Sequence, residues 1–160
     1  MDLDELRALT PSAAIDHIVS EHHEPLRRQL AELERACTAL TSGGALTGAA
    51  LSVVDLARLV GEELGQHMLK EERLAFRMIA TTGGFREVPL AVMEREHRYI
   101  DELVRELGRK TDGFTPSPGA PHALARLFAV CRQIALALPA QFAQEEALYD
   151  RFRSASEWVA

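Results

Sequence analysis

The sequence predicts an all-α protein, a single antiparallel four-helix bundle with up-down-up-down topology. Three clusters of helix-breaking residues divide the 160 residues into four long segments, none of which shows the strict alternation of a strand. The clusters are residues 41–47 (TSGGALT), 81–84 (TTGG) and 113–121 (GFTPSPGAP). Connections this short favour antiparallel neighbours. Since no repeat or linker is visible, we expect one domain over residues 1–160.

Capping residues and prolines indicate where these helices begin and bend. Thr10, followed by a proline, is typical of an N-cap with proline at the first helical position. Ser52 with Asp55 predicts a capping box at the start of the second helix. Pro25 and Pro139 lie inside helical segments, and each removes a backbone donor, so we expect a local bend at both.

The composition excludes several classes of function. The chain has 24 acidic against 18 basic residues and a net charge of -6, which disfavours binding to the phosphates of nucleic acids. No uninterrupted run reaches the ~18 apolar residues that a membrane span needs, and the acidic N-terminus lacks the apolar core of an export signal. Cys37 and Cys131 fall on apolar stripes, which indicates reduced, buried thiols. We therefore expect a cytoplasmic protein without nucleic-acid or membrane partners.

Histidine and glutamate residues interrupt the apolar stripe of every predicted helix. Residues three and four apart share one helix face. The four stripes read Val19, His23, Leu26, Leu30, Leu33, Cys37 and Leu40; Val60, Leu64, His67, Met68, Glu71, Leu74 and Met78; Met93, His97, Ile100, Val104 and Leu107; and Cys131, Ile134, Leu138, Gln141, Phe142, Glu145, Leu148 and Phe152. Burying carboxylates without partners is costly, and a metal dication supplies that partner. Imidazole and carboxylate donors suit iron, manganese or zinc.

Not every histidine belongs to this pattern. His22 competes with His23 for the inward position, because adjacent helical residues point about 100° apart and only one can face the site. We expect His17 and His122 in solvent or at a helix end. Among the aromatic residues near the expected site, we expect Tyr149 and Tyr99 to pack in the core.

Four motifs resemble the hemerythrin-like, HHE cation-binding domain family. They are HHEP at 22–25, HMLKEERLAF at 67–76, MEREH at 93–97 and QFAQEEALYDRF at 141–152. The chain is most similar to the C-terminal di-iron domain of the iron-centre repair proteins, over about residues 15–153. The resemblance implies a helical bundle that binds iron. It implies that His23, His67 and His97 are iron-binding histidines and that Glu71 and Glu145 bridge the irons.

Two positions depart from the family pattern. The family's histidine on the fourth helix falls on Gln141, whose amide oxygen is a weaker ligand than imidazole. Its second histidine in the first segment falls at residues 43–44, which are glycines. Three outcomes stay open: a weakened di-iron site, a single-metal site, or a metal-free relic. The short Cys-containing N-terminal domain of the repair proteins has no counterpart in this sequence, which argues against a direct repair role.

These observations favour a non-haem metal protein that binds one or two iron ions. Its expected role is oxygen, nitric-oxide or oxidative-stress sensing, or iron handling, with a small diatomic or oxo ligand as partner. No nucleophile–base set or nucleotide-binding loop is visible, so binding or sensing is favoured over catalysis and an enzyme role stays open. The alternative is a metal-free or weakly metal-binding bundle that acts as a regulatory or protein-interaction module. Homodimer formation is left open.

Overall fold

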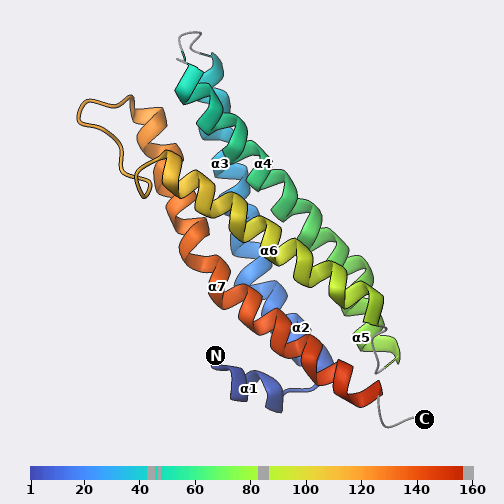
Figure 1. The fold of residues 1–160 in the computed structure, drawn as a ribbon. Helices are drawn as coiled ribbons and strands as arrows, with labels where there is room; N and C mark the ends of the chain where they lie inside the picture. Colours follow the sequence, from blue (N-terminus) through green and yellow to red (C-terminus); the bar gives the residue numbers. More distant parts are fainter. Residues whose placement is uncertain (43–45, 47, 83–86, 157–160) are drawn as a thin grey trace. The chain divides into compact units, whose positions relative to one another are not determined.

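The structure, a computed structural model, describes residues 1–42, 46, 48–82 and 87–156, and all regular elements in these ranges are helical (Figure 1). The elements are α1 (Leu3–Ala8), α2 (Pro11–Ile18), the π-helical turn η1 (Val19–His23), α3 (Glu24–Ser42), α4 (Gly48–Lys70), the π-helical turn η2 (Glu71–Ala75), α5 (Phe76–Thr82), α6 (Glu87–Lys110) and α7 (His122–Ser156). The prediction of an all-α protein is confirmed. The glycines at 43–44 lie outside the described residues.

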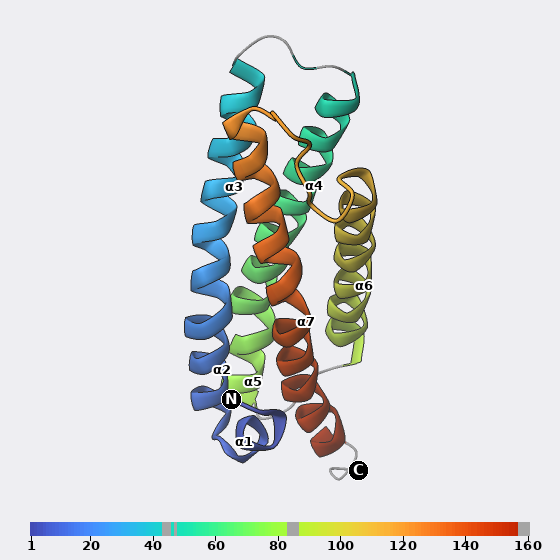
Figure 2. The same ribbon diagram turned by 90° about the vertical axis from the view of Figure 1, so that its left-hand side faces the viewer.

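The chain divides into two compact units. Unit 1 comprises Met1–Pro25, Gln66–Arg98 and Leu138–Ala160, and unit 2 comprises Leu26–Gly65 and Tyr99–Ala137. Unit 1 contains α1, α2 and α5 with the C-terminal part of α7, and Figure 2 shows the short α1 lying across the ends of α2 and α7. The apolar core of unit 1 consists of Leu6, Ala14, Ile18, Ala75, Phe76, Ile79, Met93, Ala147, Leu148, Tyr149 and Phe152. In unit 2, the thiols of Cys37 and Cys131 are buried and free, as predicted.

The helix ends confirm one predicted cap and correct another. The Thr10 side chain accepts a hydrogen bond from the Ala13 N–H at 3.3 Å, and α2 begins with proline. The capping box predicted at Ser52 is wrong, because α4 already begins at Gly48 and Ser52 lies inside it. The intervening alanines and leucine are strong helix formers, which extends the helix by one turn. The sequence prediction also missed α1, whose start carries a capping box between Asp2 and Glu5.

Two π-helical turns change the predicted stripes. In η1 the Glu24 N–H donates to the Val19 carbonyl, five residues back, directly before Pro25. In η2 the Phe76 N–H donates to the Glu71 carbonyl in the same way. Each turn holds one residue more than an α-helical turn, so the buried face moves on by one position.

The shift at η2 accounts for the one stripe residue that is wrongly placed. Leu74 was expected in the core but is 60% exposed, whereas Ala75 and Ile79 are buried at 2% and 1%. Residues before Glu71 keep the predicted face, since Leu64 is fully buried. The stripe therefore fails at the point where the helix departs from the 3.6-residue period.

One described stretch of α7 meets the length and composition expected of a membrane span. It is His122–Phe152, and about a third of its most apolar window is buried. A count of uninterrupted apolar residues misses it because Arg126 and Arg132 interrupt the run. Core helices of water-soluble proteins meet the same criteria, so the finding is weak evidence for a membrane.

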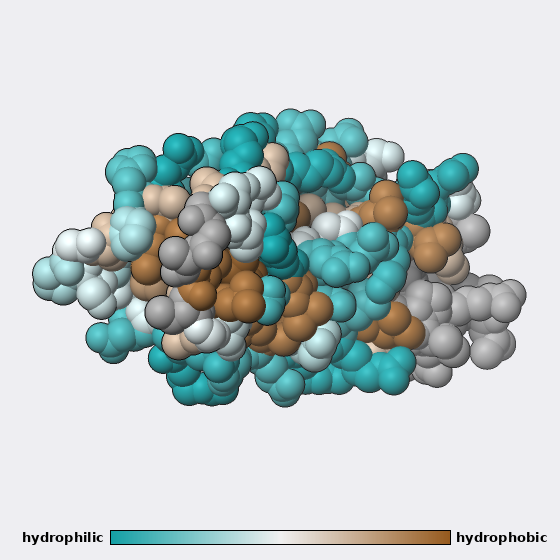
Figure 3. Space-filling view, turned by 90° about the horizontal axis from the view of Figure 1, so that it is seen from above, coloured by the Kyte–Doolittle hydropathy of each residue, from teal (hydrophilic) through white to brown (hydrophobic). Residues whose placement is uncertain are grey.

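The surface combines hydrophilic and apolar residues. On the face drawn in Figure 3, hydrophilic residues surround a central group of hydrophobic ones. Large hydrophobic residues that are exposed include Met1, Leu51, Leu69, Leu74, Tyr99 and Leu136. Tyr99 was expected in the core, and that prediction is wrong. Tyr99 lies on the outward face of α6, one residue before the fully buried Ile100.

Candidate metal centre

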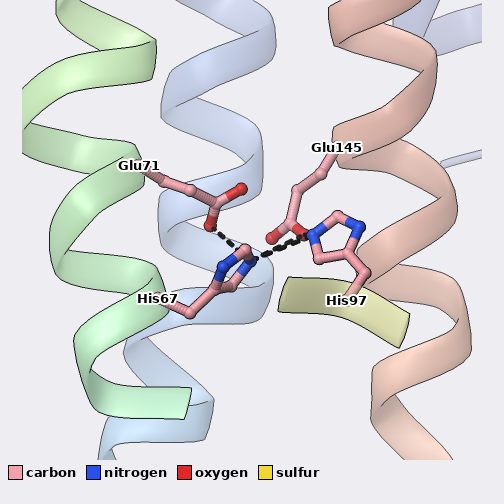
Figure 4. A group of neighbouring side chains, drawn as sticks. All are labelled: His67, Glu71, His97 and Glu145. Carbon is pink, nitrogen blue, oxygen red and sulfur yellow. Dashed lines mark hydrogen bonds and ion pairs between the residues drawn. The ribbon is translucent and has the colours of Figure 1, made fainter. Parts of the chain in front are cut away.

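Unit 1 brings together all five residues that the sequence singled out. His23, His67, Glu71, His97 and Glu145 are at most 3% exposed. Figure 4 shows four of them, from α4, η2, α6 and α7, pointing toward one another. One donor atom from each of these four, two imidazole nitrogens and two carboxylate oxygens, lies within 4.8 Å of the others. The spacing along the sequence thus identified a real spatial cluster.

Glu145 lies at the middle of this cluster. Its Oε1 is 3.1 Å from His23 Nε2, and its Oε2 is 3.1 Å from His97 Nε2. His67 Nε2 is 3.0 Å from His97 Nε2 and 3.5 Å from Glu71 Oε2. All three histidines therefore turn Nε2 inward.

The structure shows which of the two adjacent histidines in the first helical segment faces the site. His23 lies at the end of η1 and is fully buried, with Nε2 facing Glu145. His22 is half-buried and turns to the side, where Nε2 contacts Gln144 Oε1 at 3.0 Å. His122 is exposed at the first residue of α7, as expected.

Three further glutamates hold the outer nitrogens of the histidines. His23 Nδ1 lies 2.7 Å from Glu72, the first of these contacts. The other two pairs are His67 Nδ1 with Glu96 at 3.0 Å and His97 Nδ1 with Glu146 at 3.1 Å. Such a pairing determines which ring nitrogen carries the proton and orients the ring, as in the outer shell of metal sites.

The sequence prediction missed these outer glutamates, although a signal for them was present. Each is the immediate neighbour of a predicted ligand: Glu72 follows Glu71, and Glu146 follows Glu145. Because adjacent residues point about 100° apart, the neighbour of an inward ligand on one helix can reach around to the histidine of the next. Lys70 Nζ adds an ion pair to Glu96 at 2.5 Å, which fixes that carboxylate in turn.

Tyr149 and Gln141 complete the inner contacts. The Tyr149 hydroxyl is buried and donates to Glu71 Oε1, so the residue contacts the site directly and does more than fill the core. The Gln141 amide Nε2 donates to Glu145 Oε1 at 2.9 Å. The residue that stands in place of the family's fourth-helix histidine thus contacts the carboxylate instead.

Two carboxylate oxygens in the cluster lack a hydrogen bond. Among the described residues, no group donates to Glu71 Oε2 or to Glu145 Oε2, although both atoms are buried. Buried acceptors are normally paired, and an unpaired one costs about 1–3 kcal/mol. The two oxygens and the imidazole nitrogens beside them are a suitable donor set for a divalent cation of the borderline type. The residues present therefore fit a metal ion.

The pKa values of these residues in the absence of an ion also indicate that the buried carboxylates need a compensating positive charge. Burial lowers the pKa of His23, but its contacts with Glu145 and Glu71 outweigh burial and raise that pKa to about 10. Burial likewise lowers the pKa of His67, while Glu145 and the charge of Glu71 raise it to about 9. Burial and the charge of Glu145 raise the pKa of Glu71. Although burial opposes it, the three surrounding histidines hold the pKa of Glu145 well below its usual range. Protons thus compensate the buried carboxylates in the metal-free protein.

Aromatic rings shield the histidines. The His97 ring stacks on Phe142 with centroids 4.1 Å apart, and His23 stacks on Phe76 at 5.6 Å. These contacts keep water away from the imidazoles and restrict their rotation. A surface pocket of about 300 Å³ borders the outer side of His23, since Glu72 and Phe76 belong to its wall.

Comparison with known proteins finds a matching family and similar relatives. Residues 14–151 match the family described as Hemerythrin HHE cation binding domain. The Iron-sulfur cluster repair protein YtfE of Cronobacter sakazakii is 36% identical over 108 residues, which cover 66% of this chain and 49% of the relative. The protein of the same name from Escherichia coli O1:K1 / APEC is 34% identical over the same shares. The chain thus spans about half the length of these relatives.

Proposed function

Because the chain belongs to the hemerythrin HHE cation-binding family, we propose that its buried centre binds a non-haem metal, iron in the first place. His23, His67, Glu71, His97 and Glu145 are the proposed donors. The observation that carries the proposal is the pair of buried carboxylates whose Oε2 atoms face imidazole nitrogens and receive no hydrogen bond. Manganese or zinc would suit the same donors.

The surrounding residues prepare the centre for an ion. A bound metal would act as a Lewis acid toward a small ligand at any position that the protein leaves open. The outer glutamates orient the imidazoles, and Tyr149 holds one oxygen of Glu71 in place. Phe142 and Phe76 exclude water from the faces of His97 and His23.

The physiological role that we propose is oxygen, nitric-oxide or oxidative-stress sensing, or iron handling, in the cytoplasm. The relatives named as iron-sulfur cluster repair proteins support a role connected with iron and stress. Binding a small diatomic or oxo ligand is proposed in preference to catalytic turnover. We further propose that the helices form one up-down-up-down four-helix domain over residues 1–160, and homodimer formation belongs to the same proposal.

Metal analysis tests the central claim. Protein expressed with supplemented iron, or reconstituted with Fe(II), is expected to retain iron after desalting. The Glu71→Ala variant should lose that iron while its helical circular dichroism stays near the native value. Glu102→Ala, on the exposed face of α6, serves as the matched control and should retain iron. Native protein without bound transition metal after both treatments contradicts the proposal.

A second candidate is a metal-free helical module that regulates a partner. The hydrogen bond from Gln141 to Glu145 favours it, since a carboxylate that is already paired needs an ion less. In that case the His67→Ala variant would keep partner binding, and a chelator would leave the melting temperature of the purified protein unchanged. A marked fall in the melting temperature on chelation excludes this candidate.

A further inference from the structure

Within the proposed function, on which this inference rests, we infer that the centre holds one tightly bound ion per chain and not two. The ion lies among His67, His97 and the Oε2 atoms of Glu71 and Glu145. His23 and Gln141 act as hydrogen-bond donors to Glu145 in place of ligands for a second ion.

The first support is the distribution of unsatisfied oxygens. Each of the two carboxylates has one oxygen without a hydrogen bond from the described residues, and in both cases it is Oε2. His97 Nε2 lies 3.1 Å from Glu145 Oε2, and His67 Nε2 lies 3.5 Å from Glu71 Oε2. His23 Nε2 is 3.2 Å from Glu71 Oε2, but it also contacts Glu145 Oε1 and does not belong to the group of four donors that lie within 4.8 Å of one another. The two Nε2 atoms are themselves 3.0 Å apart. Four buried donor atoms thus surround one place.

The second support comes from the other two oxygens, which are already occupied. Glu71 Oε1 accepts the hydroxyl hydrogen of Tyr149. Glu145 Oε1 accepts from the Gln141 amide at 2.9 Å and lies 3.1 Å from His23 Nε2. A carboxylate that bridges two ions uses both oxygens. A second ion would therefore have to displace these hydrogen bonds and leave buried donors unpaired, which is unfavourable.

Gln141 is the reason that the His23 side of the centre differs from the side with His67 and His97. It lies four residues before Glu145 on α7, one helical turn away, so its side chain reaches the same carboxylate. An imidazole at this position would offer a strong nitrogen ligand on the side of His23. The amide offers only a weakly basic oxygen, and its NH₂ group stabilises Glu145 as a hydrogen-bonded carboxylate. The side of the centre that contains His23 therefore lacks the donors for a tight ion.

Metal titration tests the inference. Chelated, metal-free protein is titrated anaerobically with Fe(II), and the number of bound ions is counted by native mass spectrometry and elemental analysis. We expect one tight ion in the native protein. His97→Ala should weaken it by more than about 100-fold, because a direct ligand matters more than its outer partner. His23→Gln, which keeps a donor for Glu145 Oε1, should still bind one ion. Gln141→His should bind two.

The outcomes separate this inference from the proposed function. Native protein that binds no ion overturns the proposed function, and this inference with it. Native protein that binds two tight ions overturns the inference alone, as does loss of the tight ion in His23→Gln. A Gln141→His variant that still binds one ion overturns the assignment of Gln141 as the limiting residue. Helical circular dichroism of each metal-free variant verifies that it folds.

Discussion

At the scale of single residues, each histidine of the centre has an inner and an outer interaction. Nε2 faces the carboxylates, and Nδ1 contacts a glutamate that also approaches solvent. Glu96 is the best supported of these, because it contacts both His67 and Lys70. The imidazole and the Lys70 ammonium hold the pKa of Glu96 below its usual range despite partial burial, which by itself raises it. Glu96 is therefore an anionic partner that orients His67.

Neutralising this glutamate should weaken metal binding without removing a ligand. We expect Glu96→Gln to lower the affinity for Fe(II) by about 10–100-fold, the range for outer partners of metal-bound histidines. Titration with Fe(II) against a competing chelator measures it. Glu102→Gln, further along the same helix and exposed, should leave the affinity unchanged. Equal affinities for both variants would show that the outer contact does not orient His67.

The Tyr149 hydroxyl should contribute to stability as well. In the metal-free protein, Tyr149→Phe leaves Glu71 Oε1 without its buried donor. The loss should destabilise the fold by about 1–3 kcal/mol in urea unfolding. Tyr99→Phe is the control: Tyr99 is 43% exposed, so its variant should lie within about 0.5 kcal/mol of the native protein. A neutral Tyr149→Phe variant would contradict the importance of this hydrogen bond.

The raised histidine pKa values predict how stability depends on pH. His23 and His67 have pKa values of about 10 and 9 in the metal-free protein, against 6.5 for an ordinary histidine. Because the folded-state values are higher than those of the unfolded chain, their stabilisation is complete below about pH 6.5 and is lost as the pH rises through 9 and 10. Metal-free protein should lose at least about 1.4 kcal/mol of unfolding free energy between about pH 7 and pH 10, since one pKa unit corresponds to that amount.

The metal-loaded protein provides the comparison for this pH effect. A bound ion replaces a proton that compensates the carboxylates, so the His67 imidazole that binds it is already neutral at pH 7. The loaded protein should therefore lose less stability than the metal-free one over the same range. Urea unfolding of both forms at each pH measures the difference, and equal losses would argue against an imidazolium-rich centre.

At the scale of helical elements, the two π-helical turns place ligands. His23 ends η1 and Glu71 begins η2. At η2 the chain presents Glu71 inward and then returns its apolar face, with Ala75 and Ile79, to the core of unit 1. The extra residue in the turn provides that correction, which agrees with the frequent occurrence of π-helical turns at functional sites.

The register change at η2 can be tested by substitution. Leu74→Gln should alter stability by no more than about 0.5 kcal/mol, because Leu74 is largely exposed. Ile79→Gln should destabilise the protein by roughly 2–5 kcal/mol, because it replaces a buried apolar side chain by a polar one. An unbroken α-helix would predict the opposite for Leu74. Urea unfolding of both variants distinguishes the two registers.

At the scale of the whole molecule, every proposed ligand belongs to unit 1. Ligand binding stabilises the segments that must be folded to form the site, and local openings elsewhere are unaffected. We therefore expect iron to slow amide hydrogen exchange chiefly in unit 1, within Gln66–Arg98 and the part of α7 after Leu138. Exchange measured by mass spectrometry with and without iron tests this. Equal protection of unit 2 would show that the two units open together.

The sequence by itself determined the helical class and the inward positions of the five proposed ligands. Both depend on local periodicity: residues three or four apart share a face wherever the helix is regular. His67 with Glu71 and Gln141 with Glu145 follow this rule, and both pairs lie together in the structure. Family resemblance added the expectation of iron, and the family match supports it.

Only the tertiary structure decided what lies around those ligands. The outer glutamates stand next to predicted ligands in the sequence, but they pair with histidines of other helices, so spacing within one helix cannot show which histidine each one contacts. The π-helical turns shift the face after Glu71, which a constant period cannot anticipate, and thereby expose Leu74. The sequence also could not show which oxygen of each carboxylate accepts a hydrogen bond and which one does not. Whether Gln141 binds an ion or donates to Glu145 depends on where its amide points, and that depends on the packing of α7 against the rest of unit 1.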